Sequence, residues 1–274
     1  MKCLCFDKTG TLTELSFKVF GFLTVENRKF NPLANSRREL HFFSAAREFV
    51  EIMSCCHSLK MINEKLIGDP LEMELFRNTN STLLTDHSLL IELGFKEKMK
   101  IKASRENLKR FKLDMRSQYI VVYASSFNSS KRYMKVIVKE NLGGFVKVFA
   151  KGAPEVIRDM CDPSTIPTNF QETIEDYTMK GLRIIALASK TINSKNKRNL
   201  DISRIKNSEL EFQGFVLLEN PIKMHTPETL CDLKNHGIGC LMITGDNIFT
   251  SINVAARGCL LRPKQSLYLS LIHI

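Results

Sequence analysis

The sequence predicts an α/β fold into which a second, antiparallel sheet is inserted. At the N-terminus, a short apolar strand at residues 2–6 runs into a polar turn that contains glycine. Near the other end, a strand at residues 239–243 lies between two helical segments. Strands that alternate with helices in this way suggest a parallel α/β layer. Between residues 119 and 150, β-branched and aromatic residues predict an antiparallel sheet. The simplest organisation is an insertion into an α/β domain.

Two helices are predicted before the middle sheet. Between residues 39 and 59, apolar residues recur at steps of three and four, which indicates one amphipathic helix. The next helix is expected to begin at Pro70, with Asp69 as its N-cap. Glu72 would be the third-position partner of a capping box.

The middle and the end of the chain alternate strands with helices. Strands are predicted at residues 119–125, 133–139, 145–150, 182–189 and 212–218. Helices are predicted to begin at Pro154 and Phe170, the second ending at Gly181, and residues 191–209 form a polar, basic surface loop. A helix at residues 227–236 is closed by Gly237, and the strand at residues 239–243 is expected to be buried and to end in a turn before a helix that begins at about Phe249.

Composition excludes several classes of protein. The chain has 274 residues, 43% of them hydrophobic and 25% charged, which is typical of globular proteins and not of disordered or collagen-like chains. No apolar run approaches the roughly 20 residues of a membrane-spanning helix. The net charge of +11 is dispersed along the sequence, which indicates a solvated surface. The eight cysteines form no C-x-x-C pair and follow no signal peptide, so we expect reduced thiols in a cytosolic environment.

The turn after the first strand carries residues suited to phosphoryl chemistry. Asp7 stands at the carboxyl end of the strand, where open α/β sheets place their ligands, and its carboxylate can form an aspartyl phosphate. Lys8 adds positive charge, Gly10 lets the backbone approach closely, and the hydroxyls of Thr9 and Thr11 can bond phosphate oxygens. Because Thr9 has no useful pKa for acid–base catalysis, the loop should form a phosphoenzyme and retain it.

Three motifs in order resemble those of the P-type ATPases, whose catalytic core belongs to the haloacid dehalogenase superfamily. Residues 5–14 resemble the phosphorylation motif, and residues 151–155 (Lys-Gly-Ala-Pro-Glu) and 242–247 (Met-Ile-Thr-Gly-Asp-Asn) resemble the two later motifs. The resemblance implies a partial haloacid-dehalogenase-like parallel sheet with an inserted α+β domain. The implied domains are a phosphorylation domain at residues 1–14 and 219–268, and a nucleotide-binding domain at residues 15–218.

The resemblance also implies roles in the phosphorylation domain. Asp7, beside Lys8, would be phosphorylated by ATP, and Asp7 and the backbone carbonyl of Thr9 would bind Mg²⁺. A loop between a strand and a helix presents backbone N–H groups to an anion. The residues implied to hold the phosphate are Thr244 and Gly245, with Asp246 near the metal and the nucleotide. Taken alone, residues 244–247 could equally be a helix cap made by Asp246.

In the nucleotide-binding domain the resemblance implies a site for ATP. The implied contacts are Phe111 stacking on adenine, Arg116 nearby, Glu72 near the adenine, Lys151 and Gly152 at the nucleotide, and Arg183 close to the phosphates. Phe111 could instead be ordinary core, and Glu72 only a capping-box partner. Leu113 and Gln118 depart from the common pattern, which affects the expected phosphate contacts.

Further residues resemble the fifth class of the family. They are Phe6, residues 68–72 and residues 218–223, where the Glu219-Asn220 pair favours a branch that exports polyamines from late endosomes and lysosomes. The alternative is the endoplasmic-reticulum branch, which extracts misplaced membrane helices. Either way the parent would be a multi-pass membrane transporter driven by ATP hydrolysis, and this segment would face the cytosol.

Several parts of the family pattern do not occur in this sequence. They are the phosphate-neutralising lysine, the Gly-Asp-Gly-x-Asn-Asp hinge, the actuator domain with its Thr-Gly-Glu loop, and the transmembrane helices. Transport would therefore belong to the parent, and this chain would bind nucleotide with negligible autophosphorylation. Residues 269–274 resemble the translation of a sequencing-adapter end, which suggests a scar.

Two other functions are compatible with parts of the sequence. A soluble phosphatase of the same superfamily would be expected to carry an acid where Thr9 stands. A nucleic-acid-binding module would explain the positive charge, but the sequence lacks an aromatic and basic recognition motif, so we expect no nucleic-acid partner.

Overall fold

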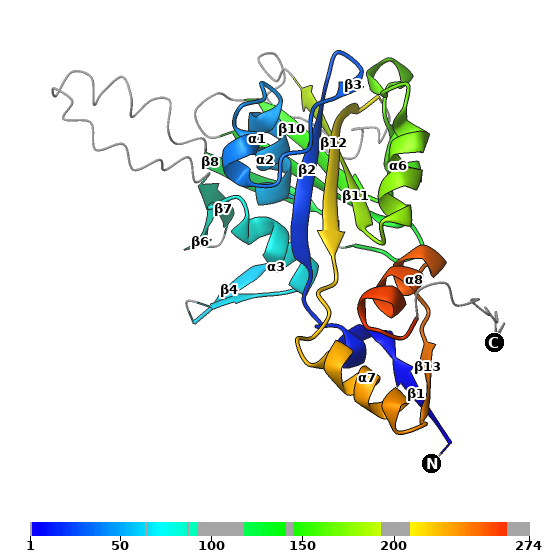
Figure 1. Cartoon of the computed structure of the whole chain (residues 1–274). Coiled ribbons are helices and arrows are strands. Elements are labelled where there is room, and N and C mark those ends of the chain that lie inside the picture. The colour runs from blue at the N-terminus through cyan, green and yellow to red at the C-terminus, as the bar shows by residue number, and fades with distance from the viewer. Residues whose placement is uncertain are drawn as a thin grey trace, which may run out of the picture. The chain divides into compact units, whose positions relative to one another are not determined.

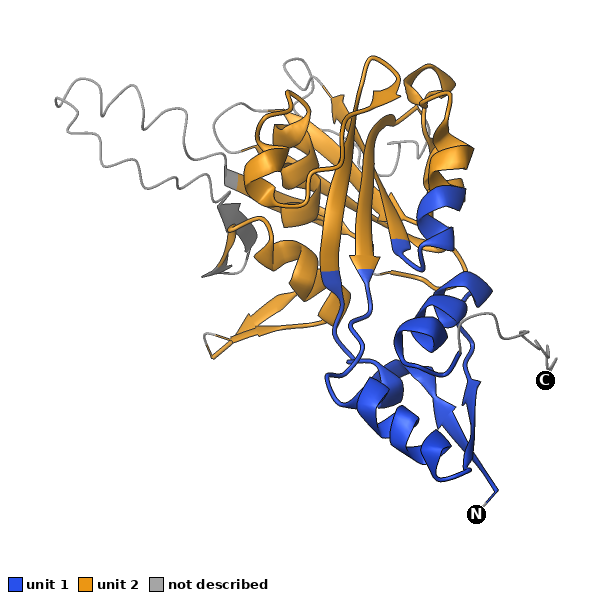
Figure 2. Ribbon diagram, in the orientation of Figure 1, with its two compact units in different colours: residues 1–18, 175–183, 219–274 blue, residues 19–174, 184–218 orange. Residues whose placement is uncertain are grey.

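The computed structural model describes residues 2–63, 65–86, 88–92, 118–125, 127–140, 145–192 and 209–261. Within these ranges no helix combines the length and the apolar character needed to traverse a bilayer. The chain divides into two compact units, coloured separately in Figure 2. Unit 1 comprises residues 1–18, 175–183 and 219–274, and unit 2 comprises residues 19–174 and 184–218.

Unit 1 is built on two parallel strands. Strand β1 (Cys3–Asp7) pairs with β13 (Gly239–Ile243) so that Asp7 lies opposite Ile243. A tight turn, η1 (Lys8–Leu12), follows β1, and the helices α7 (Thr226–Asn235) and α8 (Ile248–Arg257) flank β13 in the sequence (Figure 1). The core of the unit consists of Leu12, Leu230, Ala255 and Leu260. The parallel pairing of the two terminal strands agrees with the predicted parallel layer.

One detail of that layer differs from the prediction. Strand β13 is only half buried: Cys240 and Met242 pack against the core, whereas Leu241 and Ile243 are 55% and 57% exposed, because the described sheet has two strands and the helices cover one face. Strand β12 (Glu211–Glu219), which precedes α7 in the sequence, lies in the large sheet of unit 2.

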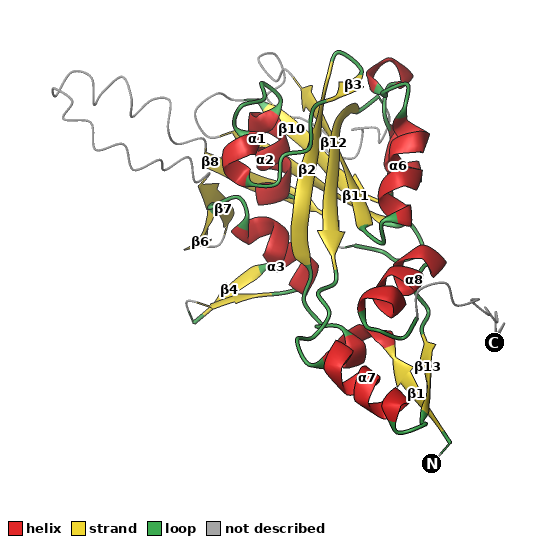
Figure 3. Ribbon diagram, in the orientation of Figure 1, coloured by secondary structure: helices red, strands yellow, loops and turns green. Residues whose placement is uncertain are grey.

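Unit 2 contains a nine-stranded sheet with the order β3-β2-β12-β11-β10-β9-β8-β7-β6 (Figure 3). Neighbouring strands from β6 to β11 are antiparallel, which confirms the predicted antiparallel sheet. The remaining strands are β2 (Lys18–Glu26), β3 (Lys29–Phe30), β6 (Thr82–Asp86), β7 (Ser88–Glu92), β8 (Gln118–Ala124), β9 (Tyr133–Glu140), β10 (Val146–Gly152) and β11 (Arg183–Ile192). A separate hairpin joins β4 (Lys60–Ile62) to β5 (Lys65–Ile67).

Short helices pack around the sheet. They are α1 (Arg37–Leu40), α2 (Ala46–Cys55), α3 (Pro70–Arg77), α5 (Pro154–Met160) and α6 (Phe170–Met179), with a 3₁₀ turn η2 (Pro163–Thr165). Helix α2 contacts both α3 and β10. Its Phe49 is fully buried and meets Phe22 edge to face at 6.0 Å. This packing fixes the end of α2 and the start of α3 next to β10.

The predicted helix at residues 39–59 is divided into α1 and α2. The reason is a carboxylate from β2: Glu26 Oε1 accepts hydrogen bonds from the Ser44 hydroxyl (2.6 Å) and the Ala45 N–H (3.2 Å). These bonds satisfy groups at the start of α2, so the helix begins anew there. The predicted loop at residues 191–209 lies mostly outside the described residues.

Candidate functional site

The turn after β1 holds Asp7 exposed at the carboxyl end of the strand. The Lys8 N–H donates to Asp7 Oδ1 (2.8 Å), and the Thr13 N–H closes the turn onto the Lys8 carbonyl (3.1 Å). Gly10 has φ +83°, and a Cβ there would lie 2.8 Å from a methyl group of Leu15. Glycine is therefore the residue that this turn accommodates without strain.

The turn that follows β13 lies next to the Asp7 turn because the two strands are paired in register. The Asp246 N–H donates to Thr244 Oγ1 (3.2 Å), and Asn247 Oδ1 accepts from the Phe249 N–H (2.8 Å). Asn247 is therefore the cap of α8, so the helix-cap interpretation of Asp246 is wrong. Gly245 and Asp246 are exposed, and Thr244 is half-buried.

An ion pair joins the two turns. Lys8 Nζ bonds Asp246 Oδ2, and the Thr9 hydroxyl also lies 3.5 Å from that oxygen. The Lys8 side chain is 1% exposed, whereas that of Asp246 is 41% exposed. The positive charge of Lys8, which was expected beside Asp7, is therefore buried and paired with Asp246. The result is an exposed edge with two carboxylates and adjacent hydroxyl groups.

A segment that sequence reasoning did not assign to the site supports the Asp7 turn. Lys223 Nζ donates to the Gly10 carbonyl (2.5 Å), and its N–H donates to the Leu12 carbonyl (3.1 Å). The Thr226 hydroxyl also donates to Leu12 (2.9 Å). The sequence indicates only a class resemblance for residues 218–223, because their contact with the turn depends on the fold.

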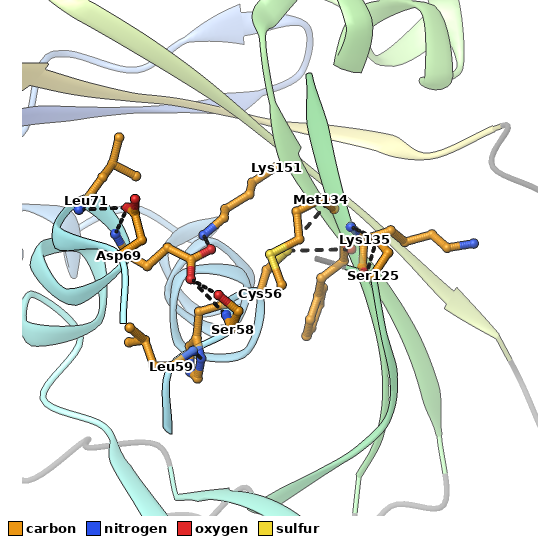
Figure 4. A network of polar contacts seen from close by, with 12 residues as sticks. Cys56, Ser58, Leu59, Asp69, Leu71, Ser125, Met134, Lys135 and Lys151 are labelled. Carbon is orange, nitrogen blue, oxygen red and sulfur yellow. Dashed lines mark hydrogen bonds and ion pairs between the residues drawn. The ribbon is translucent and has the colours of Figure 1, made fainter. Parts of the chain in front are cut away.

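A second polar group lies in unit 2, where α2 ends, α3 begins and β10 passes (Figure 4). Lys151 Nζ donates to Glu72 Oε1 (2.9 Å), and both residues are 5% exposed. The N–H and hydroxyl of Ser58 both donate to Glu72 Oε2, at 2.8 and 2.7 Å. Asp69 alone caps α3, accepting from the N–H groups of Leu71 and Glu72. The predicted capping-box role of Glu72 is therefore wrong, because its carboxylate is used by Lys151 and Ser58.

The charge state of this group follows from its contacts. Burial alone would raise the pKa of Glu72, but the Lys151 ammonium and the hydrogen bonds from Ser58 and Lys151 outweigh it and lower the pKa. Glu72 and Lys151 thus form a buried ion pair. Burial, with the nearby Lys151 charge, lowers the pKa of His57 to about 4. His57 is accordingly neutral at pH 7.

His57 has one satisfied and one unsatisfied ring nitrogen. Its Nδ1 accepts from the Leu59 N–H (3.2 Å), so the proton resides on Nε2, which finds no partner among the described residues. The ring is 3% exposed and packs edge to face on Phe76 at 5.0 Å. Sequence reasoning missed His57 and Ser58; the available signal was a polar pair directly after an apolar helix.

Comparison with known proteins identifies the family. The family model "P-type ATPase, cytoplasmic domain N" matches residues 45–225, which is more than half of the chain. The chain belongs to the P-type ATPases. Its similarity to curated members of this family extends over nearly the whole sequence, which confirms the resemblance predicted from the three motifs.

The relatives of this P-type ATPase segment include transporters from animals and yeast. It is 32% identical to the human "Polyamine-transporting ATPase 13A3" over 278 residues, which cover 94% of the chain and 22% of the relative. It is 35% identical to the "Vacuolar cation-transporting ATPase YPK9" of Saccharomyces cerevisiae over 295 residues, which cover 94% of the chain and 20% of that relative. It is also 32% identical to the "Cation-transporting ATPase catp-5" of Caenorhabditis elegans, and the matched region covers 97% of the chain and 23% of that relative. The chain thus spans about a fifth of these fifth-class relatives.

Of the remaining predicted nucleotide residues of this P-type ATPase segment, the structure describes Gly152 and Arg183. Gly152 is buried, and a Cβ there would lie 2.5 Å from the Arg132 carbonyl oxygen, so its role in the structure is close strand approach. Arg183 belongs to unit 1, where its guanidinium lies over the Phe17 ring at 5.3 Å. Phe111 and Arg116 lie outside the described residues.

Proposed function

We propose that this chain is the cytosolic catalytic segment of an ATP-driven transport ATPase that forms an aspartyl phosphate on Asp7. The observation that carries the proposal is the ion pair between Lys8 and Asp246, which holds the Asp7 turn and the Thr244 turn together in a member of this family. Residues 1–14 and 219–268 would form the phosphorylation domain, with a haloacid-dehalogenase-like parallel sheet. Residues 15–218 would form the nucleotide-binding domain.

In the reaction proposed for the whole transporter, an oxygen of Asp7 attacks the terminal phosphorus of ATP, and ADP leaves, whereas this chain alone is expected to show negligible autophosphorylation. Thr244 and Gly245 would hold the transferred phosphoryl group, because a turn before a helix offers hydroxyl and N–H donors to an anion. The carboxylate of Asp7 and the carbonyl of Thr9 are oxygen donors of the kind that Mg²⁺ prefers, so these residues fit such an ion. Mg²⁺, when bound, would neutralise charge on the phosphates.

Apart from Arg183, the residues of the proposed nucleotide site belong to unit 2. ATP would stack its adenine on Phe111, with Arg116 nearby and Glu72, Lys151 and Gly152 lining the site. Arg183 would approach the phosphates. The support for this assignment is the buried Lys151–Glu72 pair, whose residues both come from motifs that resemble nucleotide-binding sequences of the family.

The proposed cargo is a polyamine or another cation, moved across a late endosomal or lysosomal membrane by the whole transporter. The support is that the relatives named above are described as polyamine-transporting or cation-transporting ATPases. The Glu219-Asn220 pair agrees with the same branch.

The proposal is tested by titrating the chain with ATP and Mg²⁺ in a calorimeter. We expect saturable binding at one site, weakened about tenfold by Phe111→Ala, because stacking of a base on an aromatic ring contributes about 1–3 kcal/mol. Phe127→Ala is the matched control, since Phe127 is an exposed aromatic of the same unit. Absence of ATP binding to the wild-type chain would contradict the proposed function.

A further inference from the structure

Ser58 makes two hydrogen bonds to a single carboxylate oxygen. Its N–H and its hydroxyl both donate to Glu72 Oε2, whereas Lys151 bonds the other oxygen, Oε1. Two donors from one residue constrain the carboxylate more strongly than one donor does. The orientation of Oε1, and with it the place of the Lys151 ammonium, therefore depends on Ser58.

Lys151 needs such a constraint to act on a ligand. A lysine side chain is a flexible stem that ends in a point charge with three donors, and one of these donors is taken by Glu72. A defined acceptor fixes the ammonium in one direction. Ser58 fixes the orientation of this acceptor, the Glu72 carboxylate. Ser58 itself is exposed, whereas Glu72 and Lys151 are buried.

The charge of Glu72 is a second reason why its contacts matter for nucleotide binding. The carboxylate of Glu72 would repel the phosphates of a nucleotide if its charge were not compensated. Lys151 compensates the charge, and Ser58 satisfies the second oxygen, so the pair presents no uncompensated negative group. Neighbouring His57 adds no charge, because it is neutral.

We propose that Ser58 is a positioning residue of the nucleotide site, acting through Glu72 to hold the Lys151 ammonium in place for ATP. The inference rests on the proposed function, in which Lys151 and Glu72 line the nucleotide site. Ser58 is not among the site residues predicted from the sequence. Its proposed role follows from the hydrogen bonds of the folded chain.

The first test compares ATP affinities of variants of the whole chain. Ser58→Ala removes the hydroxyl bond and keeps the N–H bond, so we expect ATP to bind about three- to tenfold more weakly. Ser58→Thr keeps a hydroxyl and should restore most of the affinity. The matched control is Ser54→Ala: Ser54 is a buried serine of α2 whose hydroxyl bonds the Val50 carbonyl and the Ser81 hydroxyl, so its loss affects those contacts but no hydrogen bond of Glu72.

The second test separates positioning from general damage. If Ser58 acts through Lys151, Ser58→Ala has no further effect on ATP affinity in a Lys151→Met background. If Lys151→Met does not fold, Glu72→Gln serves as the background, because an amide cannot accept from both Ser58 and Lys151 through two oxygens. The same loss of affinity in the variant background as in wild type would overturn the proposal.

The outcomes distinguish this inference from the proposed function. If the wild-type chain does not bind ATP, both fail. If the wild type binds ATP and Lys151→Met weakens binding, but Ser58→Ala behaves like Ser54→Ala, the proposed function stands and the role of Ser58 is refuted.

Discussion

The ion pair between Lys151 and Glu72 is buried on both sides, because each of the two side chains is only 6% exposed. Buried pairs contribute little net stability, because desolvation of both groups offsets their attraction. Removing one partner is different, since the remaining charge stays buried without compensation. Stability alone therefore does not account for the pair, and nucleotide binding is the role that we propose for it.

The first prediction concerns that pair. Lys151→Met leaves the Glu72 carboxylate buried and uncompensated, so we expect the free energy of unfolding to fall by about 3–5 kcal/mol. Urea denaturation of the chain measures it. In the double variant Lys151→Met/Glu72→Gln no charge is stranded, so much of the loss should be recovered; a double variant as unstable as the sum of the two single variants would show that the residues do not interact.

The second prediction concerns His57 and pH. Its pKa is lowered to about 4 in the folded chain, from an ordinary value of 6.5, so the unfolded chain takes up the proton first as the pH falls. Stability is therefore unaffected above pH 6.5 and declines between pH 6.5 and 4, by about 2 kcal/mol at pH 5. Denaturation at pH 7 and pH 5 measures this, and His57→Gln should remove that part of the decline. An unchanged decline in the variant would exclude His57 as its source.

At the scale of elements, local signals predicted some boundaries and tertiary contacts set others. Helix α3 begins at Pro70 behind Asp69 as predicted, because both signals act within one turn. The break between α1 and α2 could not be predicted from the periodicity of residues 39–59. It depends on Glu26, which reaches the start of α2 from a strand far back in the chain.

Strand β2 shows a similar limit. Its residues 18–26 form a largely apolar run with buried positions in succession, a pattern that does not distinguish a strand from a buried helical segment. Its place in the sheet, next to β12, comes from pairing between distant parts of the sequence. The Lys151–Glu72 and Lys8–Asp246 contacts are also long-range. The residue types of the turn already indicated a site at Lys8, whereas only the family resemblance indicated that Glu72, Lys151 and Asp246 belong to sites.

The third prediction concerns the approach of β12 to β2. Gly214 has φ +137°, and a Cβ there would overlap the carbonyl oxygen of Leu23. Gly214→Ala should therefore lower the free energy of unfolding by about 3 kcal/mol or more, through strain and displaced backbone. Gly237 is the matched control, since it has φ +74° but no atom within 4 Å of its Cβ position. Gly237→Ala should lose only about 1 kcal/mol, and equal losses in the two variants would contradict the close approach.

At the scale of the whole molecule, the two units carry different parts of the proposed chemistry. Unit 1 contains the Asp7 turn, the Thr244 turn and the segment that supports the Asp7 turn. Unit 2 contains the buried Lys151–Glu72 pair and its Ser58 support. Each unit is a separate cluster of contacts, and the proposed nucleotide residues other than Arg183 belong to unit 2, so nucleotide binding is expected to survive changes in the Asp7 turn.

The most direct test of that division is hydrogen–deuterium exchange of the chain with and without ATP and Mg²⁺. The account predicts that ATP slows exchange at residues 57–59, at the first turn of α3 and in β10, and that Asp7→Asn leaves this protection intact. Lys151→Met should reduce it. Saturating ATP that leaves exchange in all three segments unchanged would contradict the assignment of the nucleotide site to Lys151 and Glu72.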